Sequence, residues 1–237
     1  MKKTVLITGG TSDLGYAIIK EFIKNKWDII FTYNTNKKRA KDICDELSTQ
    51  GVINSVRLDL QNESNINELL ERVDKLDCLV NCAAYNYDCD IFEHTKENFL
   101  KVLDINLVGP FLMSKYSYKL LNKTNGNIVN IASMNGINSM YPESIDYDAS
   151  KAGLINLTKN LSRAFAPNIR VNAVAPGWID TKNTEDMNPT FKKSEIDRIA
   201  LKRFARQEEI AKIVYFLASD DASYINGSVI CADGGRI

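Results

Sequence analysis

Short runs of apolar residues alternate with longer amphipathic stretches along the whole chain, and this alternation constrains the fold more than any other feature. The runs are nearly continuous in Val, Ile and Leu, which is typical of parallel strands buried on both faces. Such strands are expected at residues 4–8, 28–33, 54–60, 77–84, 126–133, 169–177 and 228–235. The stretches between them predict helices, because apolar residues such as Ile18, Ile19, Phe22 and Ile23 share one helical face.

Strands that alternate with helices imply right-handed crossovers between parallel neighbours. We therefore predict an α/β fold, a Rossmann-like doubly wound parallel sheet of about seven strands with about six or seven helices on both faces. The whole chain, residues 1–237, is expected to form one domain, since it contains no linker, repeat or low-complexity run. Residues 97–121 predict one long helix by their length and periodicity.

The segment at about 182–204 is polar and lacks a strand. A long polar excursion after a strand is often a lid over a substrate, and the alternative is a solvated connection with one short helix.

The composition indicates a soluble globular protein without a macromolecular charge partner. Of the 237 residues 44% are hydrophobic, and a chain of this size can bury a core without disulfide or metal staples. Lysine and arginine together equal aspartate and glutamate at 30 each, which predicts neither a nucleic acid nor a membrane partner. The five cysteines have no metal-site spacing and there is a single histidine, so we predict no metal site.

The N-terminal residues MKKTVLITGG have a basic start and a short apolar run, but glycines follow at once. They predict a buried strand rather than a signal peptide. No stretch approaches the roughly 18 apolar residues of a membrane span. We therefore expect a cytoplasmic protein in a reducing compartment.

A glycine-rich turn, Thr8-Gly9-Gly10-Thr11-Ser12-Asp13-Leu14-Gly15, joins the first strand to the first helix. Backbone N–H groups and the helix dipole at such a place favour a dinucleotide phosphate. The alternative is a structural turn in which Ser12 or Asp13 caps the helix. Because a carboxylate close to phosphates would repel them, we expect the Asp13 side chain to turn away and serve the helix start.

The second strand is followed by Asn34, where an acidic residue would bind the ribose diol of NAD. Lys37, Lys38 and Arg39 come just behind it. Without the acid and with cations in reach, a 2′-phosphate is tolerated, so the sequence favours NADP(H). The alternative is that the three cations form a solvated first helical turn.

Three later features suit carbonyl reduction. Tyr147 and Lys151 are four residues apart at a helix start, so the phenol and the ammonium share one face. Ser133 ends a strand and Asn106 lies in the middle of the long predicted helix. A phenol with a pKa of about 10 is a weak acid, and a neighbouring ammonium lowers that pKa by stabilising phenolate.

With these motifs the chain resembles the short-chain dehydrogenase/reductase family over nearly its whole length, and most of all the branch with beta-ketoacyl-carrier-protein reductases and small-alcohol and sugar dehydrogenases. The matches are collinear. They are TGGTSDLG, the pair Asp59-Leu60, NCAA (81–84), Asn106, Ser133, Tyr147-x-x-x-Lys151, APGWIDT (175–181) and the C-terminal FLASDDASYINGSVICADGG.

The resemblance implies roles for these residues. Tyr147 exchanges a proton with the substrate oxygen, Ser133 stabilises that oxygen, Lys151 binds the nicotinamide ribose and lowers the pKa of Tyr147, and Asn106 holds a water next to Lys151. Ile179 and Thr181 fix the carboxamide of the nicotinamide. Together with Asn34 at the end of the second strand, the residues assigned to the cofactor are Gly9, Thr11, Ser12, Leu14, Gly15, Asp59, Leu60, Asn81, Ala83, Tyr147, Lys151, Pro176, Gly177, Ile179 and Thr181.

Three positions depart from the family pattern. Asp13 and Ala84 stand where the family has glycines, and Cys82 stands where it has an asparagine. We expect Cys82 to be a small buried residue rather than a reactive thiol, and His94 to lie on the surface.

The leading hypothesis is therefore an NADP(H)-dependent oxidoreductase that acts on a carbonyl or secondary alcohol, with a 3-oxoacyl-carrier-protein reductase-like enzyme as one form. A small sugar or polyol dehydrogenase is an alternative of the same class. A non-catalytic NADP(H)-binding regulator is the alternative of another class, and the presence of both Tyr147 and Lys151 speaks against it. The family resemblance also implies a homotetramer.

Overall fold

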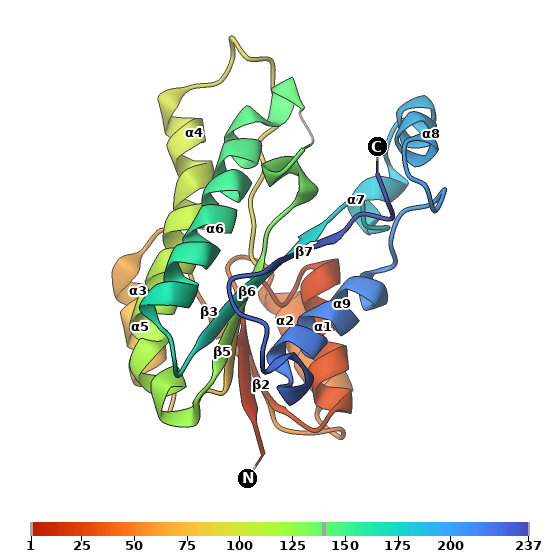
Figure 1. Ribbon diagram of the computed structural model, residues 1–237. Helices are drawn as coiled ribbons and strands as arrows, with labels where there is room; N and C mark the ends of the chain where they lie inside the picture. Colours follow the sequence, from red (N-terminus) through yellow and green to blue (C-terminus); the bar gives the residue numbers. More distant parts are fainter. Residues whose placement is uncertain (1, 139–140, 237) are drawn as a thin grey trace.

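Seven parallel strands form one sheet in this computed structural model, which describes residues 2–138 and 141–236. The strand order is β3-β2-β1-β4-β5-β6-β7. The strands are β1 (Thr4–Ile7), β2 (Asp28–Tyr33), β3 (Ile53–Arg57), β4 (Cys78–Asn81), β5 (Asn127–Ile131), β6 (Arg170–Pro176) and β7 (Val229–Ala232). The predicted doubly wound parallel sheet is confirmed (Figure 1).

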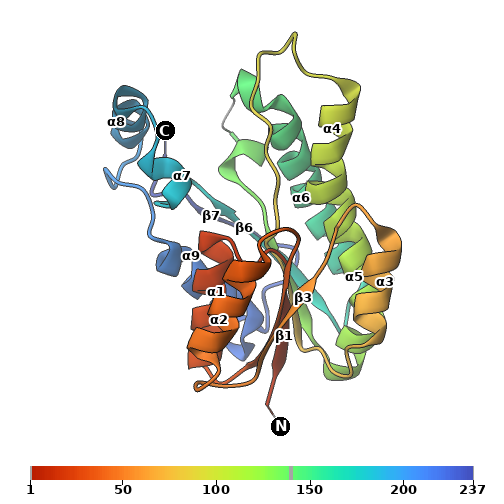
Figure 2. The same ribbon diagram turned by 180° about the vertical axis from the view of Figure 1, so that it is seen from behind.

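Helices cover both faces of this sheet. One face carries α1 (Asp13–Lys24), α2 (Lys37–Leu47) and α9 (Gln207–Ala218), and the other carries α3 (Glu63–Glu71), α4 (Lys96–Leu103), α5 (Gly109–Thr124) and α6 (Ile145–Ala164), as Figures 1 and 2 show from opposite sides. Two short helices, α7 (Lys182–Glu185) and α8 (Pro189–Asp197), stand beyond the carboxyl ends of the strands. Three single turns complete the fold, η2 (Met134–Gly136), η3 (Pro142–Ser144) and η4 (Asp220–Ala222).

The described residues thus form nine α-helices, where six or seven were expected. The segment 182–204 contains two short helices, where one of the two alternatives had a single short helix, and the long helix predicted over 97–121 is present as a continuous helical stretch from Lys96 to Thr124 with a π-helical turn inside it. Between α4 and α5 lies a π-helical turn, η1 (Asp104–Val108), that contains Asn106. Such a turn inserts an extra residue into the helix and is frequent at functional sites.

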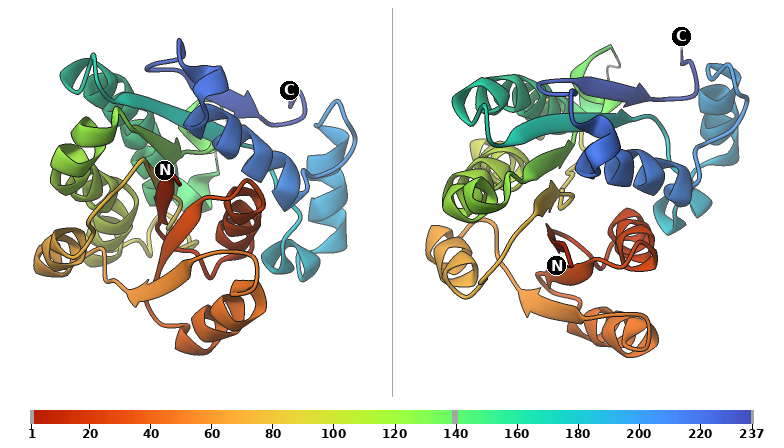
Figure 3. Two further views of the ribbon diagram at one scale, coloured as in Figure 1. Left: turned by 90° about the horizontal axis from the view of Figure 1, so that it is seen from below. Right: turned by 60° about the horizontal axis from the view of Figure 1, so that its bottom comes forward.

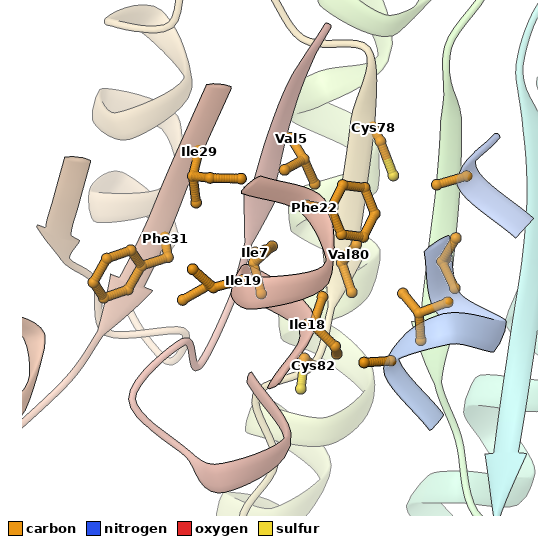
Figure 4. Packing of buried hydrophobic residues seen from close by; sticks show 14 of the residues in the cluster. Val5, Ile7, Ile18, Ile19, Phe22, Ile29, Phe31, Cys78, Val80 and Cys82 are labelled. Atoms are coloured by element: carbon orange, nitrogen blue, oxygen red, sulfur yellow. The ribbon is translucent and has the colours of Figure 1, made fainter. Parts of the chain in front are cut away.

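The inner strands β1, β4, β5 and β6 are buried on both faces, as their continuous apolar runs predicted, whereas the edge strands β3 and β7 are half-buried or exposed. Successive side chains of a strand point to opposite faces, so Val5 and Ile7 pack in the core under α1 and α9, whereas Leu6 packs in the core under α3 and α5. Figure 4 shows Val5 and Ile7 beside Ile18 and Phe22 of α1. This two-sided burial fixes the strand register, since a slip by one residue would exchange the two cores.

The strand order changes direction between β1 and β4. From β1 the chain proceeds to β2 and β3 on one side of the sheet, and from β4 it proceeds to β5, β6 and β7 on the other side. In doubly wound sheets the crevice at the carboxyl ends of such a pair binds ligands. β4 ends at Asn81, earlier than the expected residue 84, so Cys82, Ala83 and Ala84 form the start of a loop at this crevice. Figure 3 shows the sheet end-on with the two helical layers around it.

No helix among residues 2–138 and 141–236 is both long and apolar enough to cross a membrane.

Candidate active site

The glycine turn closes against the end of β4. Gly9 has a left-handed φ of +69°, and a Cβ at this position would lie 2.7 Å from the Ala83 Cα. The Thr8 hydroxyl oxygen accepts hydrogen bonds from the backbone N–H groups of Cys82 at 3.0 Å and Ala83 at 3.1 Å. A Cβ at Gly15 would come within 2.3 Å of the Gly9 carbonyl oxygen. The turn therefore requires glycine at both positions and keeps the chain close to the sheet.

The Asp13 carboxylate turns away from the turn, as expected, but it serves another segment than predicted. Ser12 caps α1, since its hydroxyl oxygen accepts a hydrogen bond from the Gly15 N–H at 3.0 Å. The Asp13 Oδ2 accepts a hydrogen bond from the backbone N–H of Lys182 at 3.0 Å. The expectation that Asp13 stabilises the helix start is therefore incomplete, because its hydrogen bond tethers the first residue of α7 to the glycine turn.

A cavity of about 630 Å³ lies at the crevice between β1 and β4. It brings together seven of the predicted cofactor residues, which are Gly9, Thr11, Ser12, Asn34, Asp59, Leu60 and Ala83. The glycine turn supplies backbone N–H groups at a helix start for phosphates, and the loop around Asp59 and Leu60 supplies the wall for a base. The residues present therefore fit a dinucleotide.

The end of β2 leaves the ribose corner of this cavity without a carboxylate. Tyr33, Asn34 and Thr35 line it, and the first helical turn of α2 follows. Two of the three predicted cations have partners, because Lys38 pairs with Asp42 at 3.0 Å and the Arg39 guanidinium lies 4.6 Å above the Tyr16 ring.

A second cavity of about 860 Å³ adjoins the first, and Ala84 and Tyr85 line both. Ser133 and Tyr147 lie in its wall, together with Gly177. Ser133 stands just beyond β5 and Tyr147 lies in the first turn of α6. Two segments that the sequence separates by 14 residues thus meet in one cavity.

Lys151 lies one helical turn behind Tyr147 and is 2% exposed. Its Nζ donates a hydrogen bond to the Ile131 carbonyl oxygen at 2.8 Å and lies 5.4 Å from the centre of the Tyr147 ring. Burial lowers the pKa of Lys151 to about 8. The ammonium and the phenol therefore share one helical face, as the spacing predicted.

Burial raises the pKa of Tyr147 to about 12 in the protein alone, and the hydrogen bond with Ser133 acts in the opposite direction. The sequence led us to expect a lowered pKa. The difference arises because the cost of burying a phenolate outweighs the Ser133 hydrogen bond, and the carboxylates of Asp148 and Asp88 raise the pKa further.

Asn106 is fully buried in the π-helical turn. Its side-chain amide accepts from the Tyr85 N–H at 2.8 Å, donates to the Tyr85 carbonyl oxygen at 2.8 Å, and donates to the Ser150 hydroxyl at 3.1 Å. It thus fixes the loop that follows β4 against α6, directly beside Tyr147 and Lys151.

Several other predicted site residues lie in neither of the two cavities. Leu14 and Ile179 are half-buried and pack against the core, and Pro176 ends β6. Asn81 is buried at the end of β4, where its amide donates to Asn130 Oδ1 at 2.8 Å. Thr181 precedes α7 and its N–H donates to the Thr184 hydroxyl at 2.9 Å.

His94 was expected on the surface, and this prediction is wrong. Its side chain is only 6% exposed and lies 3.7 Å from the Asp146 carboxylate, measured from Nδ1 to Oδ2. The loop after β4, which carries His94, folds back on the start of α6, and this contact covers the His94 side chain. Cys82 is buried as expected, and burial raises the pKa of its thiol to about 11, so it is a poor nucleophile.

Sequence reasoning missed most of the second cavity. Its further described lining consists of Asn86, Asp88, Met134, Asn135, Tyr141, Glu143, Ser144, Trp178, Thr184, Met187 and Phe191. These residues come from three loops and the segment 182–204, which no periodic pattern brings together. Only Trp178, directly after the Pro176–Gly177 turn, carried a sequence signal.

A family model described as enoyl-(acyl carrier protein) reductase matches residues 9–236. A solved short-chain dehydrogenase/reductase from Serratia marcescens superposes with a TM-score of 0.93 at 28% identity, covering 98% of this chain and 97% of that one. The chain belongs to the short-chain dehydrogenase/reductase family. Like other short-chain dehydrogenases/reductases, it is an oxidoreductase that acts on a carbonyl or alcohol with a nicotinamide cofactor.

Relatives within the family have several named activities. The 3-oxoacyl-(acyl-carrier-protein) reductase of Aquifex aeolicus is 37% identical over 98% of this chain and 96% of its own. Glucose 1-dehydrogenase 2 of Bacillus subtilis is 31% identical over 98% of this chain and 94% of its own. A blue fluorescent protein from a metagenomic library, solved in complex with NADPH, superposes with a TM-score of 0.92 at 27% identity, covering 98% of this chain and 97% of that one.

Proposed function

We propose that this short-chain dehydrogenase/reductase is an NADP(H)-dependent reductase of a 3-oxoacyl-type carbonyl, or the dehydrogenase of the corresponding secondary alcohol. The observation that carries the proposal is the convergence of Ser133 and Tyr147 on one cavity, with Lys151 one turn behind and a dinucleotide-sized cavity adjoining.

The chemistry of each residue follows from its place. The Tyr147 hydroxyl gives its proton to the developing alkoxide during reduction and accepts it in the reverse direction. The Ser133 hydroxyl donates a hydrogen bond to the same oxygen and stabilises its charge. Lys151 holds the ribose and presents positive charge to Tyr147. Asn106 keeps the adjoining loop in place beside Lys151. The nicotinamide, when bound, supplies or accepts the hydride.

NADP(H) is favoured over NAD(H) because the ribose corner has no acidic side chain and Lys37 stands at the start of α2. A carboxylate at Asn34 would bind the ribose diol and repel a 2′-phosphate, whereas an amide tolerates it. The NADPH-bound structural relative supports the same choice. The residues proposed to hold the cofactor are those assigned from the sequence, with Tyr85 and Lys101 added from the cavity wall. No role is proposed for a metal.

The substrate class is inferred from the relatives and from the cavity. The relatives named 3-oxoacyl-(acyl-carrier-protein) reductases favour a 3-oxoacyl group. A small sugar or polyol is the second candidate, because Asn86, Asp88, Asn135 and Glu143 give the cavity side chains that bind hydroxyl groups. The relative named glucose 1-dehydrogenase supports this second candidate.

We further propose a cytoplasmic homotetramer without a nucleic acid or membrane partner. Apolar side chains at Leu100, Val108, Phe111 and Tyr118 are exposed along α4, η1 and α5, and they suit a contact between copies. The described cysteines are unpaired, which fits a reducing compartment. Sedimentation at micromolar concentration tests the assembly, and a monomer there contradicts it.

Tyr147→Phe tests the catalytic proposal. The variant keeps the ring and removes the proton donor, so kcat for reduction of a 3-oxoacyl ester with NADPH should fall by about 10²–10⁴-fold. NADPH affinity, measured by fluorescence titration, should stay within about threefold. Tyr224→Phe is the matched control, because it removes a phenol hydroxyl from a fully exposed side chain outside both cavities and outside the proposed contact between copies, and its kcat should be unchanged. Undiminished turnover by Tyr147→Phe would contradict the catalytic role and favour a binding-only protein.

A further inference from the structure

Glu195, on α8, is a carboxylate that the chemistry above does not use. Its side chain is 2% exposed although the segment around it is polar. Burying a carboxylate is costly unless charge and hydrogen bonds compensate for it. A buried acid in a surface segment therefore calls for a specific role.

Three donors from three other parts of the chain converge on one oxygen of Glu195. Its Oε2 accepts from the Tyr141 hydroxyl at 2.6 Å and from the Trp178 Nε1–H at 2.7 Å. The guanidinium of Arg236, 7% exposed, lies 2.7 Å from the same oxygen. We call Tyr141, Trp178, Glu195 and Arg236 the Glu195 cluster. It joins the loop before α6, the turn after β6, α8 and the C-terminal segment.

Two members of the Glu195 cluster, Tyr141 and Trp178, are walls of the cavity that contains Ser133 and Tyr147. The Trp178 ring stacks on Phe204 with centroids 5.7 Å apart, and it meets Phe191 edge-on at 6.2 Å. The Arg236 guanidinium lies 5.4 Å from the Tyr141 ring. The carboxylate thus fixes how the Trp178 and Tyr141 rings are oriented in the wall of this cavity.

The two rings have no other hydrogen-bond acceptor than Glu195 and each other among the described residues, since the Trp178 N–H also approaches the Tyr141 hydroxyl at 3.2 Å. Without the carboxylate, the Tyr141 hydroxyl would lose its acceptor and the Trp178 N–H would keep only the longer contact with the Tyr141 hydroxyl at 3.2 Å, so the two half-buried rings would rotate to find water. The cavity wall would then change its shape while Ser133, Tyr147 and Lys151 stay in place.

We propose that Glu195 is a positioning residue that sets substrate specificity by holding Trp178 and Tyr141 as the aromatic wall of the substrate cavity, with Arg236 of the C-terminal segment as its charge partner. The proposal rests on the assignment of that cavity as the substrate site. Glu195 touches no reacting atom, so it acts on substrate binding and on the choice between substrates of different bulk.

Glu195→Gln is the direct test, because it keeps the shape, removes the negative charge opposite Arg236 and leaves a weaker, neutral acceptor for the three donors that converge on Oε2. NADPH-dependent reduction is measured with ethyl 3-oxobutanoate and with the bulkier ethyl benzoylacetate. The KM for the preferred ester should rise at least tenfold while its kcat stays within threefold. The ratio of kcat/KM between the two esters should change at least fivefold, and the NADPH affinity should not change.

Arg198→Gln is the matched control, because Arg198 is the exposed cation on the other oxygen of Glu195, at 3.4 Å. Its KM and its ester ratio should stay within twofold of wild type. Arg236→Gln should act like Glu195→Gln, and Arg236→Lys should restore at least part of the substrate affinity.

Tyr141→Phe provides a test if the charge variants do not fold, because it removes one hydroxyl and keeps the ring. Its ester ratio should move in the same direction as that of Glu195→Gln. Unchanged KM and ester ratio in folded Glu195→Gln or in Tyr141→Phe would overturn the positioning role alone. Absence of carbonyl turnover by the wild-type protein would overturn the proposed function, and the specificity role with it.

Discussion

Asp13 offers a quantitative test of how the segment 182–204 is attached to the glycine turn. Its carboxylate is half-buried and accepts one hydrogen bond, from the Lys182 N–H at 3.0 Å. A hydrogen bond to a charged group contributes about 1.5–3 kcal/mol when buried, and partial exposure reduces it here to about 1 kcal/mol. Loss of about 1 kcal/mol changes an equilibrium about fivefold. Asp13→Ala should therefore raise the KM of the carbonyl substrate about fivefold.

Asp13→Asn separates this tether from simple charge repulsion. The asparagine keeps an oxygen that accepts from the Lys182 N–H, so its KM should stay within about twofold of wild type. A carboxylate repelling two phosphate charges about 6 Å away in water would cost roughly 1.4 kcal/mol, which is about tenfold in affinity. If this repulsion operates, Asp13→Ala and Asp13→Asn both remove it, and both variants should bind NADPH about tenfold more tightly than wild type.

Steady-state kinetics and fluorescence titration of NADPH measure the two effects separately. Asp45→Ala, at an exposed carboxylate on α2, is the control for loss of one negative charge. A tenfold tightening of NADPH binding in both Asp13 variants, with no difference in KM between them, would refute the tether.

Two further predictions concern the cofactor corner and the buried lysine. Asn34→Asp should lower the NADPH-to-NADH ratio of kcat/KM at least tenfold, because a carboxylate binds the ribose diol and repels the 2′-phosphate; an unchanged ratio would show that Asn34 does not face the ribose. Lys151→Met should abolish most turnover. It should nevertheless raise the free energy of unfolding at pH 7 by up to about 3 kcal/mol, because burial lowers the pKa of Lys151 in the folded protein to about 8, below the ordinary value of 10.5. Below about pH 8 the folded wild-type protein bears the full cost of the buried charge. Between about pH 8 and 10.5 the unfolded state binds a proton that the folded state does not, so wild-type stability should rise with pH in urea titrations and this rise should be absent in the variant.

The sheet was predictable because its inner strands are buried on both faces and leave continuous apolar runs, as in Val5-Leu6-Ile7. The positions of Ser133, Tyr147 and Lys151 were predictable for a related reason. Parallel strands end at one edge of the sheet, and residues four apart on a helix share a face. Local periodicity and topology together bring these three side chains to the same end of the sheet.

The wall of the substrate cavity was not predictable in this way. Tyr141, Trp178 and Glu195 come from irregular loops and a short helix, and only tertiary contacts bring them together. The same holds for His94, whose polar neighbours suggested the surface although the loop folds back over it. The pKa of Tyr147 also depends on burial that no sequence pattern expresses.

Two carboxylates help to attach the segment 182–204, from which Thr184, Met187 and Phe191 line the proposed substrate cavity. Asp13 holds the N–H of Lys182 at its beginning, and Glu195 holds Trp178 and Arg236 near its end. The first carboxylate belongs to the glycine turn, which is proposed to bind the cofactor phosphates, and the second belongs to the segment itself. The hydrogen bond of Asp13 therefore links the glycine turn to a segment that lines the proposed substrate cavity. Because neither carboxylate contacts the proposed reacting atoms, changes at Asp13 and Glu195 should alter substrate affinity and selectivity while Ser133, Tyr147 and Lys151 retain their geometry.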